Sequence, residues 1–201
     1  MNIGVFLSSR DSSPQNLRAA KMLGKILAQN DKTLVYGGSM AGCMGAVSRH
    51  ALHNNGKVIA VYPDGILEDE PVRMNATQTI ITKTMDERKR KLIDLSEGFI
   101  IMPGGYGTME ELMQLMTEIA IGVTKEKPIV LVGEKFFGPI LQMFSSMAKL
   151  GMVDEESLLK LFIVENDEAG LEQAIHIIEY FEDLKSEALD LINKIRKERG
   201  Y

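Results

Sequence analysis

The chain has 201 residues, of which 45% are hydrophobic and 25% are charged. These values are typical of soluble globular proteins and exclude a disordered or fibrous chain, and the length favours one domain spanning residues 1–201. The formal charge of −5 leaves no global basic field to neutralise a phosphate backbone, so we expect no nucleic-acid partner.

A single cysteine, Cys43, excludes an intramolecular disulfide and a cysteine-based zinc cluster, and it fits a reducing compartment. The apolar run 1–7 is too short for a signal peptide, and no run approaches the ~18 residues of a membrane span. His50, His53 and His176 show no ligand spacing with carboxylates, so we expect no metal site. The sequence thus predicts a cytoplasmic protein without a membrane partner.

Short aliphatic runs alternate with amphipathic stretches along the whole chain. The runs are continuously apolar, which is typical of strands covered on both faces, and the spacing leaves room for helical crossovers. Together they predict an α/β fold with a parallel sheet of about seven strands flanked by helices. The expected strands are 3–7, 33–36, 58–62, 79–82, 99–102, 129–132 and 162–164.

Helix signals lie between these strands. Ser13 followed by Pro14 predicts the start of a helix over 15–29, with one buried stripe through Leu17, Ala20, Leu23 and Leu27. Further helices are expected over 44–54, 85–95, 108–121, 139–150, 168–181 and, at the C-terminus, about 186–199. The last helix carries Leu189, Ile192 and Ile195 on one side, which favours docking on the domain over binding a partner.

Two glycine-rich loops follow predicted strands, where open parallel sheets bind ligands. The loop 36–45 contains four glycines and leads into a helix, so it fits either a phosphate-binding turn or a tight structural turn. The loop 102–111 places Gly104, Gly105 and Gly107 before a helix, and this spacing predicts an anion-binding nest to which Thr108 adds a hydroxyl. Neither loop has the lysine of a P-loop, and the first strand lacks the G-x-G-x-x-G fingerprint, which disfavours ATP hydrolysis and NAD chemistry.

Glu111 has two interpretations. The spacing of Thr108 and Glu111 fits a capping box, in which both side chains satisfy the helix N-terminus, and this is the favoured local interpretation. A carboxylate in the first turn after a glycine nest also faces any ligand of that nest. The position therefore makes Glu111 a candidate for chemistry as well.

A charged run over 83–93 contains two residues that helical spacing separates from the solvated face. Arg88 and Lys89 share a stripe with Met85, Leu92 and Ile93, so they should face the protein. A buried arginine requires an anionic partner, which is either a carboxylate such as Glu111 or a bound phosphate.

These motifs resemble those of the LOG (Lonely Guy) phosphoribohydrolases, long mislabelled as lysine decarboxylases. Residues 103–111 match the family signature PGGxGTxxE, and residues 85–89 look like its second motif, a methionine and two variable positions before Arg-Lys. The resemblance covers roughly residues 1–180. It implies a Rossmann-like doubly wound fold, usually dimeric, that cleaves the N-glycosidic bond of a nucleoside 5′-monophosphate.

The same resemblance implies roles for individual residues. Arg88 and Glu111 would form the catalytic pair, while Gly104, Gly105, Gly107 and Thr108 would hold the 5′-phosphate. The matched motifs also place five residues among the substrate contacts, namely Gly38, Ser39, Met85, Lys89 and Glu110. The expected products are ribose 5-phosphate and a free base, best known as a cytokinin, and the reaction requires no cofactor.

Two departures from the family pattern leave the base preference open. Asp86 stands where many members have histidine, and Gly37-Gly38-Ser39 with Cys43 replaces the usual triple glycine and leucine. A non-catalytic nucleotide carrier of the same fold is the alternative hypothesis. A decarboxylase dependent on pyridoxal phosphate is disfavoured, because no lysine lies in a recognisable Schiff-base site. The helix over 108–121 is apolar on more than one face, which predicts packing against a second copy.

Overall fold

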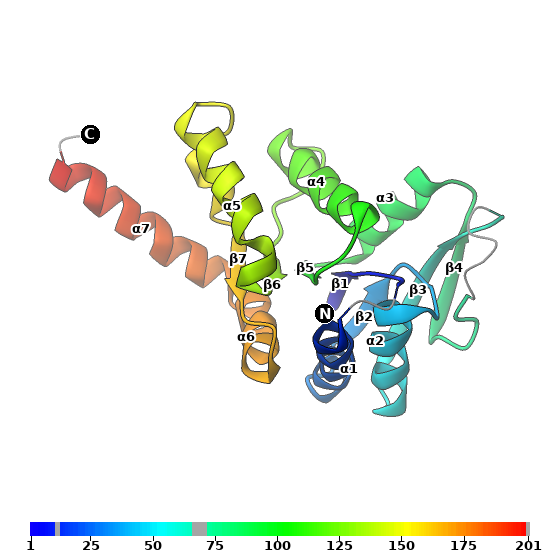
Figure 1. Cartoon of the computed structure of the whole chain (residues 1–201). Helices are drawn as coiled ribbons and strands as arrows, with labels where there is room; N and C mark the ends of the chain where they lie inside the picture. Colours follow the sequence, from blue (N-terminus) through cyan, green and yellow to red (C-terminus); the bar gives the residue numbers. More distant parts are fainter. Residues whose placement is uncertain (11–12, 66–71, 200–201) are drawn as a thin grey trace.

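The computed structural model describes residues 1–10, 13–65 and 72–199, with side chains placed up to residue 190. Within these ranges, seven strands form one parallel sheet in the order β4-β3-β2-β1-β5-β6-β7 (Figure 1). The predicted α/β class and all seven predicted strands are confirmed. The strands are β1 (Asn2–Phe6), β2 (Thr33–Tyr36), β3 (Lys57–Pro63), β4 (Gln78–Thr82), β5 (Gly98–Ile101), β6 (Ile129–Val132) and β7 (Leu161–Val164).

Helices cover both faces of the sheet, as the continuously apolar strands require. Figure 1 shows α1, α2 and α6 on one face and α3, α4 and α5 on the other. The helices are α1 (Pro14–Gln29), α2 (Gly42–His53), α3 (Met85–Leu95), α4 (Tyr106–Ala120), α5 (Glu134–Lys149), α6 (Glu168–Glu179) and α7 (Phe181–Arg199), with a short 3-10 helix η1 (Glu155–Leu158). None of the helices described here combines the length and apolar character needed to cross a bilayer.

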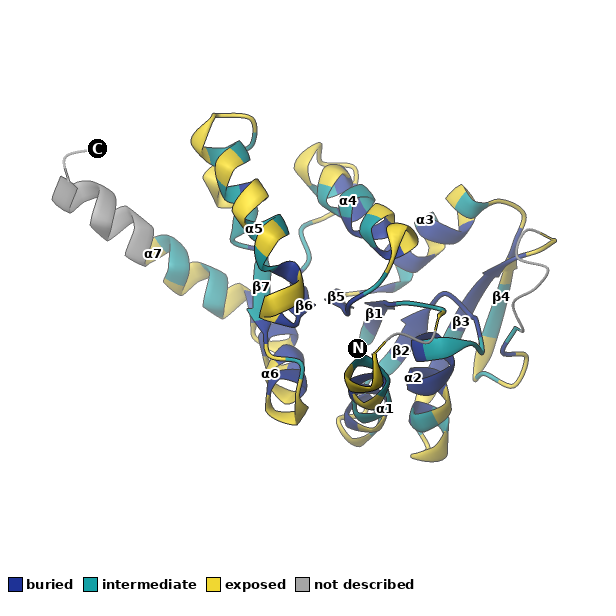
Figure 2. Ribbon diagram, in the orientation of Figure 1, coloured by how far each residue is buried: buried dark blue, intermediate teal, exposed yellow. Residues whose placement is uncertain are grey.

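Two apolar cores lie on either side of the sheet, and Figure 2 shows the strands and inward helix faces as the buried parts of the fold. The predicted stripe of α1 is confirmed, because Ala20, Leu23 and Leu27 are fully buried in the first core. The second core joins Leu92 of α3 to Leu112 of α4. This second core fixes the two helices that carry the candidate catalytic residues.

The chain reverses its direction across the sheet between β1 and β5. Strands β1 to β4 are added outward on one side, and the crossover through α3 then returns the chain to β5 on the other side of β1. Such a switch point leaves a crevice outside the carboxyl ends of the two central strands, because their following loops diverge to opposite faces.

Several predicted helix boundaries are wrong. The helix expected over 139–150 begins five residues earlier, at Glu134, and Pro139 lies inside it. A helix over 139–150 would place Pro139 at its first position, but Pro139 lies in the second turn of α5, where it removes one backbone hydrogen bond without ending the helix. The last helix begins at Phe181 rather than at 186, directly after α6 ends. Its predicted stripe includes Ile192 and Ile195, whose side chains lie outside the described residues.

A buried carboxylate joins α3, α4 and the loop that follows α4. Glu118 accepts hydrogen bonds from Gln114 Nε2 at 2.9 Å and Thr124 Oγ1 at 2.8 Å, and it pairs with Arg90 Nη2 at 2.8 Å. Burial opposes ionisation of Glu118, but these donors and the Arg90 cation outweigh it and hold the pKa of Glu118 below its ordinary value of 4.5.

This network predicts pH-dependent stability. Because the pKa of Glu118 is lowered by folding, its carboxylate stabilises the fold above the ordinary carboxyl pKa, and this contribution is lost as the pH falls through the folded pKa. Glu118→Gln should lower the free energy of unfolding by about 1–3 kcal/mol at neutral pH. The difference from the unaltered protein should shrink below pH ~4.5, measured by urea unfolding followed by circular dichroism.

Glu172→Gln is the matched control, because Glu172 is an exposed residue of α6. It should leave the unfolding free energy within about 0.5 kcal/mol at every pH. A Glu118→Gln effect that stays constant from neutral to acid pH would contradict the assignment.

Candidate active site

A cleft of about 660 Å³ lies at the carboxyl ends of β1 and β5. Its walls come from the loop after β1, from the start of α3, and from the loop after β5 with the first turns of α4. The volume is within the range of small-molecule sites, and the position is the switch point of the sheet. Eight of the eleven predicted site residues line it: Met85, Arg88, Gly104, Gly105, Gly107, Thr108, Glu110 and Glu111.

Arg88 and Glu111 form a buried ion pair in this cleft. Arg88 Nη1 donates a hydrogen bond to Glu111 Oε1 at 2.9 Å, and the two residues are only 4% and 6% exposed. The helical stripe predicted that Arg88 faces inward, and this prediction is confirmed. The partner is the carboxylate that the sequence analysis named as one of two alternatives.

The remaining nitrogens of Arg88 are held by the backbone. Its Nε donates to the carbonyl of Val61 at 3.3 Å, and Nη2 donates to the carbonyl of Gly37 at 3.5 Å. A Cβ atom at Gly37 would lie only 2.0 Å from Nη2, so a side chain at this position would displace the guanidinium. The loop after β2 therefore takes part in the site by fixing Arg88.

Glu111 lies in an environment that disfavours its charge. Burial raises the pKa of the Glu111 carboxyl, while the Arg88 cation opposes this rise. The capping-box interpretation is wrong: α4 begins at Tyr106 with Gly105 as its N-cap, so Thr108 is already the third helical residue. Glu111 consequently reaches Arg88 rather than the helix N-terminus.

The N-terminus of α4 faces the cleft through the predicted glycine nest. No side chain caps this helix, and Gly105 and Gly107 leave open space beside the backbone. Thr108 is buried and packs over Gly104, where a Cβ atom would lie 2.1 Å from the threonine hydroxyl. Uncapped N–H groups at the start of a 15-residue helix form a site for an anion.

Lys89 and Glu110 form a second ion pair at the edge of the cleft. The Lys89 ammonium bonds Glu110 and lies 3.2 Å from Asp86, and these carboxylates raise the pKa of Lys89, the hydrogen bond to Glu110 having the largest effect. Lys89 faces inward, as predicted, but it does not line the cleft itself. This pair ties α3 to α4 next to the buried pair.

Gly38 and Ser39 lie apart from this cleft. Ser39 is buried, accepts a hydrogen bond from the Ala41 amide at 3.1 Å, and forms a bridge with Val72. Nearby, the buried Arg73 donates to the carbonyl of Gly45 at 3.5 Å. The substrate-binding role assigned to Gly38 and Ser39 stays a prediction.

The cleft contains residues that the sequence analysis did not select. Ser8, Ser9 and Arg10 line it from the loop after β1, and Met44 lines it from α2. The rule that ligands bind where parallel strands end could have identified the first three, since they directly follow the first predicted strand. Tyr106, 96% exposed at the cleft edge, lacked a sequence signal beyond the glycine loop around it. Over the described residues, no group of histidines, cysteines and carboxylates has the arrangement of a metal site.

Comparison with known proteins agrees with this geometry. A family model described as "Possible lysine decarboxylase" matches residues 44–175. The chain belongs to this family. It is 31% identical over 170 residues to the cytokinin riboside 5′-monophosphate phosphoribohydrolase of Mycobacterium marinum, with 85% of this chain and 91% of the relative covered. The enzyme of the same name from Mycobacterium tuberculosis is 32% identical, with 82% and 88% covered.

A plant relative carries the same enzyme name. The cytokinin riboside 5′-monophosphate phosphoribohydrolase LOG of Oryza sativa is 36% identical over 141 residues, which cover 69% of this chain and 57% of that protein. The predicted membership of the LOG family is thus confirmed. All three relatives are named as phosphoribohydrolases.

Solved structures confirm the Rossmann-like fold. The molybdenum cofactor binding protein of Rippkaea orientalis superposes with a TM-score of 0.67 at 23% identity, covering 90% of this chain and 96% of that one. The molybdenum cofactor carrier protein of Chlamydomonas reinhardtii gives 0.65 at 22% identity, with 88% and 96% covered. Members of this fold therefore include proteins named as carriers.

The buried pair predicts strong energetic coupling. Arg88→Met leaves a buried carboxylate without its cation, and Glu111→Gln leaves a buried guanidinium without its anion, so each change should cost about 3–5 kcal/mol of stability. The double variant should cost much less than the sum of the two, because it leaves no buried charge uncompensated. Urea unfolding of the four proteins measures the coupling, and additive single effects would show that the pair does not interact.

Proposed function

We propose that the protein hydrolyses the N-glycosidic bond of an N6-modified adenosine 5′-monophosphate, releasing the free base and ribose 5-phosphate. The observation that carries this proposal is the buried Arg88–Glu111 pair at 2.9 Å, which lies in the same cleft as the uncapped N-terminus of α4. The names of the relatives support the same reaction.

The 5′-phosphate is assigned to the glycine nest. Backbone N–H groups of the first turn of α4 and the hydroxyl of Thr108 supply donors, and the helix dipole favours a negative ligand. Phosphate held at this point leaves the ribose next to Glu111, one turn further along the helix. A nucleoside without its phosphate lacks this anchor.

Glu111 carries the chemistry at the ribose. Breaking the C1′–N bond builds positive charge on the sugar, and a carboxylate beside it stabilises an oxocarbenium-like transition state. In this step the bonding electrons leave with the base, the water oxygen bonds to C1′, one water proton stays in the new C1′ hydroxyl, and the other proton ends on the base. The carboxylate also orients the attacking water.

Arg88 is best assigned to positioning Glu111. Its Nη1 bonds the carboxylate, while Nε and Nη2 are held by the carbonyls of Val61 and Gly37. This arrangement fixes the orientation of the carboxylate and opposes the rise in its pKa. Stabilisation of the departing base by the same guanidinium is the other role that its location allows.

The walls of the cleft suit an apolar substituent on the base. Met44, Met85 and Met109 line it together with Leu7. Thioether side chains are polarisable and adapt to flat rings and flexible alkyl groups. This lining supports an N6-modified adenine over a more polar base.

Glu111→Gln should lower kcat on the order of 10²–10³ without abolishing nucleotide binding, because it removes the charge that the transition state requires. The assay incubates the protein with AMP and with N6-isopentenyl-AMP and quantifies free base and ribose 5-phosphate by chromatography. The corresponding nucleosides serve as substrate controls, and Glu172→Gln, distant on α6, serves as the matched variant. Full activity in Glu111→Gln would refute the mechanism.

A non-catalytic nucleotide carrier is the second candidate, favoured by the structural likeness to cofactor carrier proteins. It requires the same phosphate nest but no turnover. Stoichiometric binding of both monophosphates without release of base, in the unaltered protein, would favour the carrier over the hydrolase.

We also propose a homodimer, formed through the apolar outer surface of α4 and the loop that follows it. Met113 and Met116 are only half buried, and Ile121 and Val123 are 68% and 59% exposed. Apolar side chains gathered in this way are typical of interfaces. The cytoplasmic location stays a prediction from the sequence.

Sedimentation velocity tests the proposed dimer. The unaltered protein should sediment as a species of twice the chain mass, and Ile121→Asp with Val123→Asp should shift it toward the monomer, because charge at an apolar interface is desolvated without a partner. If the unaltered protein sediments as a monomer at micromolar concentration, this interface is refuted.

A further inference from the structure

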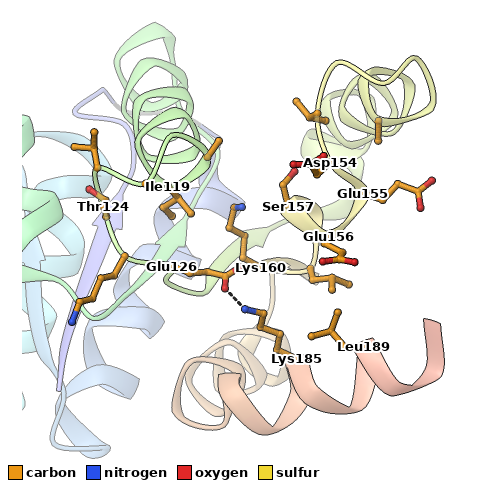
Figure 3. Close-up of a pocket in the computed structure, with 17 residues that line it drawn as sticks. Ile119, Thr124, Glu126, Asp154, Glu155, Glu156, Ser157, Lys160, Lys185 and Leu189 are labelled. Carbon is orange, nitrogen blue, oxygen red and sulfur yellow. Dashed lines mark hydrogen bonds and ion pairs between the residues drawn. The ribbon is translucent and has the colours of Figure 1, made fainter. Parts of the chain in front are cut away.

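A second cleft, of about 960 Å³, lies at the opposite end of α4 and shares no residue with the first. Its walls are the segment 119–126 at the end of α4 and after it, the segment 153–160 around η1, and the first three turns of α7 (Figure 3). Its lining residues have no part in the proposed hydrolysis. Binding in this cleft is therefore independent of the proposed hydrolysis, while Val123 belongs both to this cleft and to the proposed dimer surface.

Lys160 enters this cleft as a buried ammonium without a partner. The residue is 2% exposed, and within the described part of the chain no carboxylate or hydrogen-bond acceptor lies within bonding distance of its Nζ. Only its backbone is engaged, through a hydrogen bond from the Ile129 amide to its carbonyl at 2.8 Å. Figure 3 shows the side chain extending into the space between Ile119 and Ser157.

Other lysines in similar surroundings are satisfied. Lys127 donates to the carbonyls of Ile93 and Ser96 at 2.7 and 2.6 Å, and Lys89 is paired with two carboxylates. Inside the second cleft, Lys185 is paired with Glu126. A buried charge without a partner is costly, and in this respect Lys160 differs from these three lysines.

Burial lowers the pKa of Lys160 below its ordinary value, and the charge of Glu126 offsets this only in part. An anion bound at Nζ would remove the cost, because it supplies the missing charge and acceptor together. A negatively charged group in this cleft would therefore be stabilised most at the Lys160 ammonium.

The rest of the cleft limits the class of anion. The carboxylate of Asp154 lines the η1 side, and the carboxylate of Glu126 opposite is already paired with Lys185, so a group with one negative charge would meet less repulsion from Asp154 than a doubly charged phosphate would. Apolar side chains, which include Ile119, Val153, Leu159 and Leu189, offer contacts to an organic body. Of the lysines that line the cleft, Lys185 is paired with Glu126 and Lys125 is exposed, so Lys160 is the buried cation. One buried cation beside apolar groups suits a single negative charge on a small apolar molecule.

We propose that this cleft binds a small organic monocarboxylate, with the carboxylate on Lys160 Nζ and the apolar body against Ile119, Val153 and Leu159. The ligand spans the segment after α4 and the segment before β7. Lys160 is the residue that selects for charge, and the apolar wall selects for an aliphatic or aromatic body.

Amide NMR titration of the full-length ¹⁵N-labelled protein tests the proposal. The probes are 3-methylbutyrate, benzoate and acetate, with 3-methylbutan-1-ol as the uncharged analogue and inorganic phosphate as the dianion. A carboxylate with an apolar body should give saturable shifts at millimolar concentration in segments 119–126 and 153–161. The alcohol and phosphate should give smaller shifts, and acetate should bind more weakly than 3-methylbutyrate.

Lys160→Met should weaken carboxylate binding by at least about tenfold, equivalent to ~1.4 kcal/mol. Lys125→Met is the matched control, since Lys125 lines the same cleft but is exposed, and it should leave the affinity unchanged. Lys160→Arg keeps the positive charge and should retain binding. It therefore distinguishes loss of the cation from a folding defect. The proposal is overturned if no carboxylate gives saturable shifts, if the alcohol binds equally well, or if Lys160→Met binds as the unaltered protein does.

Discussion

The buried ion pair between Arg88 and Glu111 is the constraint on which the central part of this fold depends. Two charges removed from water are tolerated only where geometry and further hydrogen bonds compensate them. Here the compensation comes from separate parts of the chain: α3 supplies the cation, α4 the carboxylate, and β3 and the residue after β2 the backbone carbonyls. The pair therefore requires α3 and α4 to dock in one register over the sheet, and Lys89 with Glu110 supports the same register.

Much of this arrangement could be predicted from the sequence, because the signals involved are local and periodic. Continuous aliphatic runs specify buried parallel strands, and helical spacing alone predicts that Arg88 faces inward. The partner of Arg88 could not be selected in this way, since it lies 23 residues away on another helix. The predicted start of α4 at residue 108 is wrong for a similar reason: Thr108 and Glu111 have cap-forming side chains, but the Glu111 carboxylate bonds Arg88 of another helix.

Proteins named as phosphoribohydrolases and proteins named as carriers share this architecture. In the proposed function, the switch point and the uncapped helix N-terminus would bind the phosphate, and neither depends on a reactive group. Turnover would then require a carboxylate one turn into α4, which the guanidinium of α3 holds. The second cleft lies beyond the other end of α4, so the two sites draw on different segments of a single helix.

The close approach at Gly37 has a consequence for protein engineering. Because the guanidinium occupies the space that a side chain would need, enlarging Gly37, the residue after β2, would displace Arg88. The methionines on the cleft wall are different, since Met44, Met85 and Met109 contribute side chains rather than backbone to it. Libraries aimed at a new base preference should therefore vary the methionines and leave the glycine unchanged.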